Sequence, residues 1–397
     1  MPDHSAGAAA PGDYQGPLSG IRVLDFGRYI AGPFCAALLG EFGADVIRVE
    51  RPEGGEDRFL MPIAQDGTGA MFMQMNRNKR SLALDPKTDK GREAVRRLVK
   101  SADVVVANLP PATLKKMGLD YESLCALRPD IILVNLTAYG DRGPWQSRPG
   151  FDGVGQVMTG GVYLTGEAGE PPRRAQVNWV DQITATNAAF GTLLALFERQ
   201  RSGRGQEVRG ALLNSALSVN SSLLIEEDAI QRDRKPCGNR GVTSAPNNLF
   251  ETRDGSWVVV QTVGPYQFAR LAKVAGHPEW LDNPDYASDE SRVRREWELL
   301  EPLTEWCRQQ DRDALIDRLC EVGIPAAPVL SPREALQHPQ IVASGLLREM
   351  TYPGMDKPNL IAAAPISLLG TPGSLRRPAP GIGEHNAEIL AELGLEG

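Results

Sequence analysis

Residues 20–50 read GIRVLDFGRYIAGPFCAALLGEFGADVIRVE and combine two kinds of pattern. Residues 20–26 and 44–50 are rich in β-branched and apolar side chains, as buried strands are. Residues 32–42 are mostly apolar and helical in character, and Gly43 is suited to a helix stop. A strand, a helix and a strand within about 30 residues predict a βαβ unit with a right-handed crossover.

The same alternation continues downstream. Residues 91–101 place Ala94, Val95, Leu98 and Val99 on one helical face, which predicts an amphipathic helix. Residues 81–85 suit a short edge strand, and apolar runs of strand length stand at residues 104–107 and 131–136. Strands that alternate with helices favour an α/β fold, in which helices cover a mostly parallel sheet.

The middle of the chain predicts two more helices. Residues 181–199 read as a helix whose interior, at 188–197, is apolar all round and is therefore expected to be buried between layers. Residues 199–209 are polar and contain glycine, which predicts an exposed turn. A second helix is expected over residues 212–224.

We interpret residues 226–330 as a small domain that is inserted into a large one, formed by residues 1–225 and 331–397. Within the insertion, residues 248–261 read as two short strands joined by a turn, and charged helices follow, which predicts an α+β domain. Residues 1–16 are small and polar, and they predict a disordered arm.

The composition excludes several classes of protein. With 43 Lys and Arg against 50 Asp and Glu, the net charge is -7, and no basic block offers a nucleic-acid footprint. The five cysteines are widely spaced without a C-x-x-C pair, which favours reduced thiols in a cytoplasmic protein over disulfides or zinc. The longest apolar stretch has about half the length of a membrane span. We therefore expect no nucleic acid, membrane or metal partner.

Several common catalytic motifs are missing from the sequence. No G-x-G-x-x-G follows the first strand, no glycine-lysine pair indicates a P-loop, and neither G-x-S-x-G nor H-E-x-x-H occurs. The four histidines stand in the first residues or in loop-like contexts. Chemistry in this protein is therefore expected to depend on carboxylates, backbone dipoles and cations, without an ATP site.

Asp181 is the first residue of the predicted helix of residues 181–199, ahead of its apolar interior. An aspartate at this place is a favoured N-cap, since its carboxylate accepts hydrogen bonds from the first free N–H groups. The same place suits a nucleophile, because helix N-terminal N–H groups also stabilise an anion formed on it. Local sequence leaves both interpretations open.

Two further features have two interpretations each. The glycine-rich stretches at residues 150–155, 159–161 and 165–167 suit either simple turns or close approach of a substrate. Residues 76–81, NRNKRS, concentrate three cations and suit either a solvated loop or a phosphate-binding patch.

A set of short segments occurs in a fixed order along the chain, namely GIRVLDF (20–26), AGP (31–33), GADVIRVERP (43–52), NKRS (78–81), ADV (102–104), TG (165–166), GRGQ (203–206), GIP (323–325) and GEH (383–385). With these segments the chain resembles the family III CoA-transferases. This family includes formyl-CoA transferase, crotonobetainyl-CoA:carnitine CoA-transferase and α-methylacyl-CoA racemase. The segments extend from about residue 17 to the C-terminus, so the resemblance covers the whole chain.

The resemblance implies that Asp181 is the catalytic nucleophile, and Asp152 falls where transferases carry an auxiliary acidic residue. It implies a transfer of CoA from an acyl-CoA donor to a free carboxylic acid, through an aspartyl mixed anhydride and an aspartyl-CoA thioester. Exchange of one thioester for another is nearly energy-neutral, which agrees with the missing nucleotide site. CoA and acyl-CoA are then substrates, and no tightly bound cofactor is expected.

The resemblance also implies where CoA binds. The matching positions are Tyr29, Arg51, Leu84, Lys87, Asn108, Lys116 and Met117. The cations Arg51, Lys87 and Lys116 would meet phosphates, and the apolar members would flank the adenine and pantetheine. Core packing remains an alternative for Leu84 and Met117, and an exposed charge remains one for the two lysines.

Three departures from the family pattern sharpen this interpretation. The histidine of the racemase branch would fall at Phe151, and a phenyl ring serves neither as acid nor as base. Formyl-CoA transferases carry a glutamine where this chain has Ile30, which makes formyl-CoA/oxalate exchange a poor match. A common arginine after the Asn108 position is replaced by Pro110, so the resemblance does not carry over the phosphate contact of that arginine.

Several alternatives stay open at this level. The first is an acyl-CoA racemase or epimerase, or an isomerase that moves CoA between two carboxyls of one molecule. The second is a non-catalytic acyl-CoA-binding protein. Arg173 and Arg174 suit either recognition of a second carboxylate, on a dicarboxylic acceptor, or a solvated turn. The resemblance further implies a Rossmann-like large domain and a homodimer whose two chains interlock.

Overall fold

The computed structural model describes residues 14–395 and divides the chain into two compact units. The first unit comprises Met1–Val162, Arg174–Arg232 and Val342–Gly397, and the second comprises Tyr163–Arg173 and Asp233–Ile341. The predicted arm lies outside the described residues except for positions 14–16, where the Tyr14 hydroxyl donates a hydrogen bond to the carbonyl of Pro372 (2.7 Å). The division into separately folding domains at residues 226 and 330 stays a prediction.

The first unit is built on a six-stranded sheet of order β3-β2-β1-β4-β5-β6, in which every neighbouring pair is parallel. Its strands are β1 (Arg22–Asp25), β2 (Asp45–Glu50), β3 (Lys79–Ala83), β4 (Val104–Ala107), β5 (Ile132–Thr137) and β6 (Glu207–Ala211). This confirms the predicted βαβ unit and parallel sheet. The strand order reverses between β1 and β4, which opens a crevice at the carboxyl ends of these two strands.

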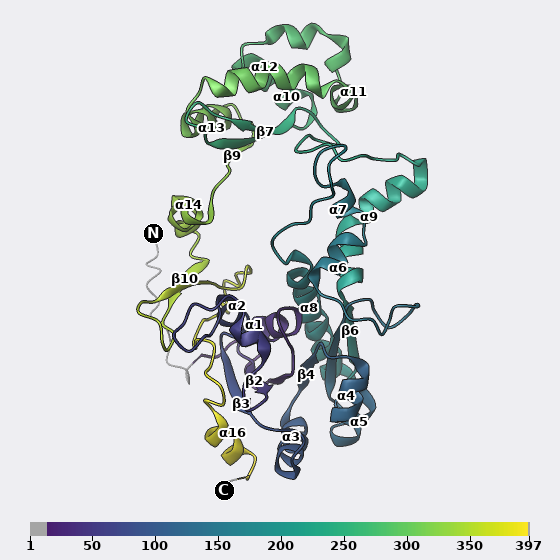
Figure 1. The fold of residues 1–397 in the computed structure, drawn as a ribbon, viewed down its shortest axis with the longest axis vertical. Helices are drawn as coiled ribbons and strands as arrows, with labels where there is room; N and C mark the ends of the chain where they lie inside the picture. The colour runs from purple at the N-terminus through teal and green to yellow at the C-terminus, as the bar shows by residue number, and fades with distance from the viewer. Residues whose placement is uncertain (1–13, 396–397) are drawn as a thin grey trace. The chain divides into compact units, whose positions relative to one another are not determined.

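Helices cover both faces of this sheet, as Figure 1 shows. They are α1 (Ala31–Glu41), α2 (Ala70–Met75), α3 (Asp89–Ser101), α4 (Pro111–Met117), α5 (Tyr121–Leu127), α6 (Asp152–Val157), α8 (Trp179–Ser202), α9 (Leu212–Ile230) and α16 (Asn386–Glu392), with the 3-10 turn η1 (Glu56–Phe59). A two-stranded sheet of β10 (Leu347–Met350) and β11 (Asn359–Ala362) completes the unit. Two of the boundaries between the units fall within short helices. One follows Val162 in α7 (Gly161–Leu164), and the other follows Ile341 in α15 (Pro339–Ala343).

Alternating side chains on the strands supply two separate cores, because successive residues of a strand point to opposite faces. Val23 and Val104 pack in one core with α1 and α8, and Leu24 and Val105 pack in another with α3, α4 and α5. The apolar face predicted for residues 91–101 is buried in the second core. Both faces of the sheet are thus covered, as a parallel sheet requires.

Two predictions around α8 are wrong. Residues 199–209 are not one exposed turn, because α8 continues to Ser202 and β6 begins at Glu207. The apolar run at 188–197 is not buried all round, since Phe190 and Phe197 are more than half exposed. The small residues of the run, such as Ala188, face the core and allow α8 to pack closely beside α1 (Figure 1). Of the large residues, Leu196 is buried in the same core, while the others face outward.

The C-terminal segment returns to cover the open edge of the sheet at β3. Asn386 accepts a hydrogen bond from the Ala83 N–H (2.8 Å) and donates one to the Ala83 carbonyl (3.0 Å). The Ser81 N–H donates to the imidazole of His385 (3.2 Å). The predicted edge strand is thus present, but it spans Lys79–Ala83 rather than residues 81–85, and the segment GEH (383–385) with Asn386 protects it from pairing with another chain.

The second unit, drawn mostly in green in Figure 1, contains a three-stranded antiparallel sheet of order β7-β8-β9. Its elements are β7 (Asn247–Glu251), β8 (Trp257–Gln261), α10 (Gly264–Val274), η2 (Pro278–Asp282), η3 (Pro284–Tyr286), α11 (Asp289–Arg294), α12 (Glu296–Arg308), α13 (Arg312–Glu321), β9 (Ala326–Pro328) and α14 (Pro332–Gln337). Phe250, Leu271 and Leu303 belong to its own apolar core.

Candidate active site

A cavity of about 590 Å³ lies in the first unit, at the carboxyl ends of β1, β4 and β5. This is the side of a doubly wound parallel sheet, next to the switch in strand order, where ligands bind. The polar and aromatic side chains that line the cavity include Arg28, Tyr29, Asn108, Arg148, Phe151 and Asp181.

Asp181 lies in the first turn of α8, two residues after its first residue Trp179. The N-cap of α8 is Asn178, so the N-cap interpretation of Asp181 is wrong. Its side chain is half-buried, and no hydrogen bond to its carboxylate comes from the described residues. Burial, together with the nearby charge of Asp152, raises the pKa of Asp181 to about 7. The carboxyl is therefore poised to change its charge near neutral pH.

Asp152 is the first residue of α6 and is almost completely buried. Its Oδ2 accepts hydrogen bonds from the backbone N–H groups of Val180 (2.8 Å) and Asp181 (3.1 Å), at the start of α8. Gln156, one turn further along α6, donates to the other carboxylate oxygen. The stretch at 150–155 is therefore not a simple glycine-rich loop, because α6 begins within it. Asp152 is not among the residues that line the cavity.

Asn108 joins the loops that follow β1 and β4. Its side-chain oxygen accepts a hydrogen bond from the Arg28 N–H (2.7 Å), and its amide donates to the Arg28 carbonyl (2.8 Å). The next residue, Tyr29, has a φ of 62°, and its ring packs edge-on against Phe151 with centroids 5.3 Å apart. One rim of the cavity is therefore held in a fixed shape.

A second cavity of about 180 Å³ lies beside the carboxyl ends of β1, β2 and β3. Its lining includes Arg51, Leu84 and Met117, and it shares Arg28 and Leu109 with the first cavity. Tyr29 and Asn108 line the first cavity. Lys87 and Lys116 are exposed and line neither cavity. Five of the seven residues that the resemblance connects with CoA thus lie along two cavities with a common boundary.

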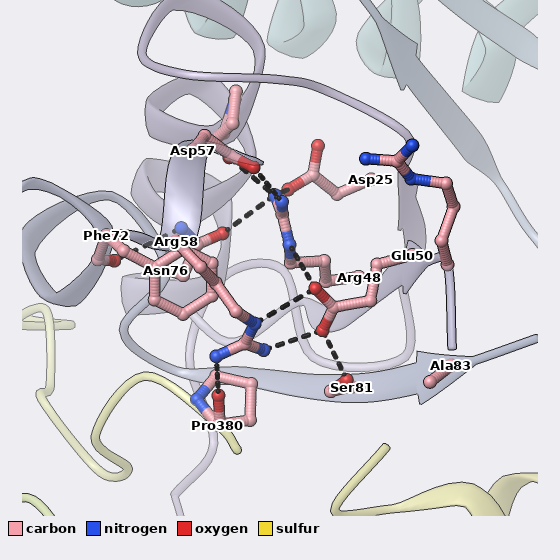
Figure 2. Close-up of polar contacts among 12 residues, drawn as sticks. Asp25, Arg48, Glu50, Asp57, Arg58, Phe72, Asn76, Ser81, Ala83 and Pro380 are labelled. Atoms are coloured by element: carbon pink, nitrogen blue, oxygen red, sulfur yellow. Dashed lines mark hydrogen bonds and ion pairs between the residues drawn. The ribbon is translucent and has the colours of Figure 1, made fainter. Parts of the chain in front are cut away.

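A buried ionic cluster adjoins the second cavity, whose lining includes its members Arg48 and Glu50 (Figure 2). It consists of three cations and three carboxylates, namely Asp25, Arg48, Glu50, Asp57, Arg58 and Lys79, each of which is at most 7% exposed. Arg48 donates to both oxygens of Asp57 (2.9 Å each), and Arg58 donates to both oxygens of Glu50 (2.6 and 3.1 Å). Lys79 donates to Asp25 (2.7 Å).

The segment NRNKRS (76–81) belongs to this buried region, so both predictions for it are wrong. All six of its residues are buried, and its three cations are each ion-paired with a carboxylate. Arg77 pairs with Glu41, Lys79 with Asp25, and Arg80 with Asp45 (2.7 Å) and two acids of α16. These cations stabilise the fold and do not form a phosphate-binding patch.

The structure adds site residues that sequence reasoning missed. Arg28 and Arg148 line the first cavity, and Gln156 supports Asp152. Arg28 directly follows the first strand and Gly27, so its place at a strand end could have singled it out. Arg148 stands in an irregular polar segment without any signal. Arg173 and Arg174 are exposed and line neither cavity.

No group of three or more His, Cys, Asp or Glu side chains within residues 14–395 is arranged to hold a metal ion. In the same part of the chain, no helix has both the length and the apolar content that a bilayer crossing requires.

Comparisons with known proteins agree on one family. The model of "CoA-transferase family III" matches residues 18–386. A succinate–glutarate CoA-transferase of Agrobacterium fabrum is 36% identical over 391 residues, which cover 95% of this chain and 96% of the relative. A succinyl-CoA–D-citramalate CoA-transferase of Chloroflexus aurantiacus is 34% identical, with 95% and 94% covered. The crystal structure of a CaiB/BaiF family protein from Brucella suis superposes with a TM-score of 0.84 at 34% identity, over 96% of this chain and all of the other.

The chain therefore belongs to CoA-transferase family III. It is an enzyme of the transferase class, acting on CoA thioesters and carboxylic acids, as the resemblance predicted.

Proposed function

We propose that this enzyme moves CoA from an acyl-CoA donor to a free dicarboxylic acid through covalent intermediates on Asp181. One observation carries the proposal above all. Asp181 presents a half-buried carboxylate, free of hydrogen bonds from the described residues, to a cavity that adjoins the one lined by Arg51, Leu84 and Met117. A carboxylate with few hydrogen bonds is a better nucleophile, and covalent catalysis divides one difficult displacement into easier steps.

In the first half-reaction, CoA passes from the acyl group of the donor to the carboxyl group of Asp181. An oxygen of Asp181 attacks the thioester carbonyl carbon, the C–S bond breaks, and an acyl-aspartyl anhydride forms beside the CoA thiolate. The thiolate then attacks the Asp181 carbonyl carbon of the anhydride. The donor acid leaves as a carboxylate, and an aspartyl-CoA thioester remains.

The second half-reaction reverses these steps with the acceptor. A carboxylate oxygen of the acceptor attacks the aspartyl-CoA carbonyl carbon and expels the thiolate, which forms a new anhydride. The thiolate attacks the acyl carbon that comes from the acceptor, so the new acyl-CoA leaves and the Asp181 carboxylate is restored. One thioester is consumed and one is made, so no nucleotide is needed.

The adenine of CoA lies in the second cavity, and its pantetheine arm extends into the first cavity. Leu84 and Met117 supply apolar contacts to the adenine, and Arg51 faces the phosphates. Tyr29 and Asn108 lie along the route to Asp181. Lys87 and Lys116 are exposed, where their charges attract the 3′-phosphate and diphosphate from solvent.

The second carboxylate of the acceptor is recognised by Arg148. Its guanidinium lies 4.1 Å from the Trp145 ring centroid, it lines the cavity with Asp181, and no ion pair joins it to a carboxylate of residues 14–395. A planar guanidinium suits bidentate recognition of a carboxylate. The relatives are named for succinate, glutarate and citramalate, all dicarboxylic acids, which supports the same substrate class.

The racemase alternative finds no second base. Phe151 is well exposed in the cavity beside Tyr29, at the position where the resemblance would require a histidine. Removal of an α-proton on one face and its return on the other needs an acid or base on both sides, which a phenyl ring does not supply. Transfer is the better proposal.

The active form is a cytoplasmic homodimer. On α8, Phe190, Leu193, Leu194 and Phe197 form an exposed apolar stripe, with each side chain between 45 and 63% exposed. Contiguous apolar surface of this kind marks an interaction site, and a second copy of the chain covers it. The interlocked arrangement of the two chains rests on the family resemblance alone.

A panel of donors and acceptors tests the proposed transfer. The wild-type enzyme should transfer CoA from succinyl-CoA to other dicarboxylic acids, and Asp181→Asn should lower kcat/KM by at least about 1,000-fold. The matched control is Asp120→Asn, which changes an aspartate that caps α5 and lines neither cavity. Undiminished transfer by Asp181→Asn would refute the mechanism, and tight CoA binding without transfer by the wild-type protein would favour a binding protein instead.

Arg148→Gln tests the acceptor class separately. The change should raise KM for a dicarboxylic acceptor about tenfold and leave a monocarboxylic acceptor unaffected, because only the first loses a charged contact. Arg142→Gln, in the same loop but not lining the cavity, is the control. An equal rise in KM for both acceptors in Arg148→Gln would show that Arg148 does not bind the second carboxylate.

A further inference from the structure

A second carboxylate, that of Asp152 in α6, lies against the start of α8 and does not line the cavity. We propose that Asp152 is a positioning residue, which occupies the first N–H groups of α8 and thereby keeps the Asp181 carboxylate free to attack. The inference rests on the proposed function of Asp181 and goes beyond it, since it assigns a task to a residue that touches no substrate.

The argument begins with the unpaired N–H groups of a helix. The first turn of α8 leaves backbone N–H groups without intrahelical partners, and an acidic side chain in that turn is the nearest group to bind them. Asp181 is such a side chain, yet it does not bind them. Asp152 Oδ2 binds the N–H groups of Val180 (2.8 Å) and Asp181 (3.1 Å) instead. Since Asn178 makes no side-chain cap either, Asp152 is the group that caps α8.

Gln156 holds Asp152 in this position and fixes the approach to α8. Its amide N–H donates to Asp152 and to the Val177 carbonyl (3.3 Å), and its oxygen accepts from the Ala175 N–H (3.0 Å). Both Asp152 and Gln156 are at most 3% exposed. The segment that leads into α8 is therefore fastened to α6 by side chains that water does not reach.

Gly155 permits this close approach of the two helices. A Cβ atom at Gly155 would lie 2.6 Å from Cγ1 of Val180 and 3.2 Å from the Leu212 carbonyl oxygen. Any larger residue would push α6 away from the start of α8, and with it the carboxylate of Asp152. The glycine-rich pattern at residues 150–155 thus has a packing reason next to the nucleophile.

The arrangement has an electrostatic consequence for Asp181. Hydrogen bonds from the helix start would stabilise its anion, and Asp152 removes them and adds a like charge nearby. The charged groups that line the cavity are Arg28, Glu56 and Arg148, and none of them is paired with Asp181. Asp181 thus keeps a raised pKa and a more basic, more nucleophilic carboxylate.

The test is the pH dependence of kcat/KM for CoA transfer by the full-length enzyme. In Asp152→Asn, the amide oxygen still accepts from the two N–H groups, but the like charge is gone. The acid limb should therefore move to lower pH by at least about one pH unit, and kcat should fall about tenfold. Asp152→Ala leaves the N–H groups to Asp181, so kcat should fall further, by about 100-fold.

Asp120→Ala, which removes the side-chain cap of α5, should leave the acid limb in place, and it separates a loss of capping from a loss of positioning. A wild-type acid limb in folded Asp152→Asn would overturn the electrostatic part of the inference, and a wild-type kcat in folded Asp152→Ala would overturn the positioning part. The proposed function fails by a different result, namely transfer that persists in Asp181→Asn.

Discussion

The two groups of buried carboxylates in the first unit have opposite surroundings. In the ionic cluster, Glu50 lies beside Arg58 and Arg48, and every carboxylate has a cationic partner. Burial alone would raise the pKa of Glu50, but hydrogen bonds from Arg58 and the charge of Arg48 lower it below its usual value. At the start of α8, Asp181 lies near Asp152, and the same burial raises its pKa to about 7.

The difference separates stability from reactivity. A paired, fully hydrogen-bonded carboxylate stays ionised, holds its neighbours in place and is a poor nucleophile. An unpaired carboxylate beside a like charge costs stability, and the same unfavourable environment makes it reactive. Both groups stand at the carboxyl ends of the strands of one sheet, so the fold supplies a rigid support and a reactive group side by side.

The largest expected effect comes from breaking the ionic cluster. Arg48→Met removes the cation that contacts Asp57 and leaves this carboxylate buried without a charge partner. The free energy of unfolding, measured with urea, should fall by about 3–5 kcal/mol. The matched control is Arg92→Met, which breaks an exposed pair with Asp89 and should change stability little. An equal loss of unfolding free energy in both variants would contradict the claim that the buried ion pairs stabilise the fold more than exposed ones do.

A smaller effect of opposite sign is expected for the nucleophile. Asp181→Asn removes a carboxyl whose folded pKa of about 7 lies well above its ordinary value, so at pH 8 the variant should be more stable than the wild-type protein. The wild-type protein gains stability from the neutral carboxyl at low pH and loses it as the pH rises through 7. The advantage of the variant should therefore be absent near pH 4 and grow up to neutral pH.

Urea unfolding of both proteins at pH 4, 6 and 8 measures this advantage. Since the test does not depend on activity, it is independent of the donor and acceptor chosen for the transfer assay. A constant difference between the two proteins at the three pH values would contradict a raised pKa at Asp181. A variant that is less stable at pH 8 would contradict the idea that the carboxylate is unfavourably placed.

Periodicity in the sequence predicted the elements whose cause is local. The strands β1 and β2, and helices α1 and α3, were predictable because their apolar spacing and their terminating residues lie within the elements themselves. β6 was missed, because EVRGA contains neither an apolar run nor strict alternation. The exposed side of α8 was unpredictable too, since a run that is apolar all round does not indicate which face is covered.

Contacts between distant residues explain the errors at the site. The cations of NRNKRS (76–81) looked unpaired because their partners Glu41, Asp25 and Asp45 lie at least 35 residues away along the chain. The capping of α8 by Asp152 joins residues 28 and 29 positions apart. No local pattern reveals such pairs, whereas the family resemblance did single out both aspartates.

The most direct test of the central claim is covalent labelling of Asp181 as a function of pH. The enzyme is mixed with succinyl-CoA without an acceptor, quenched within one turnover and analysed by intact-protein and peptide mass. We expect an aspartyl-CoA or succinyl adduct on Asp181, absent from Asp181→Asn, whose rate of formation rises with a midpoint near pH 7. An adduct on another residue, or a rate already maximal at pH 5, would contradict the account.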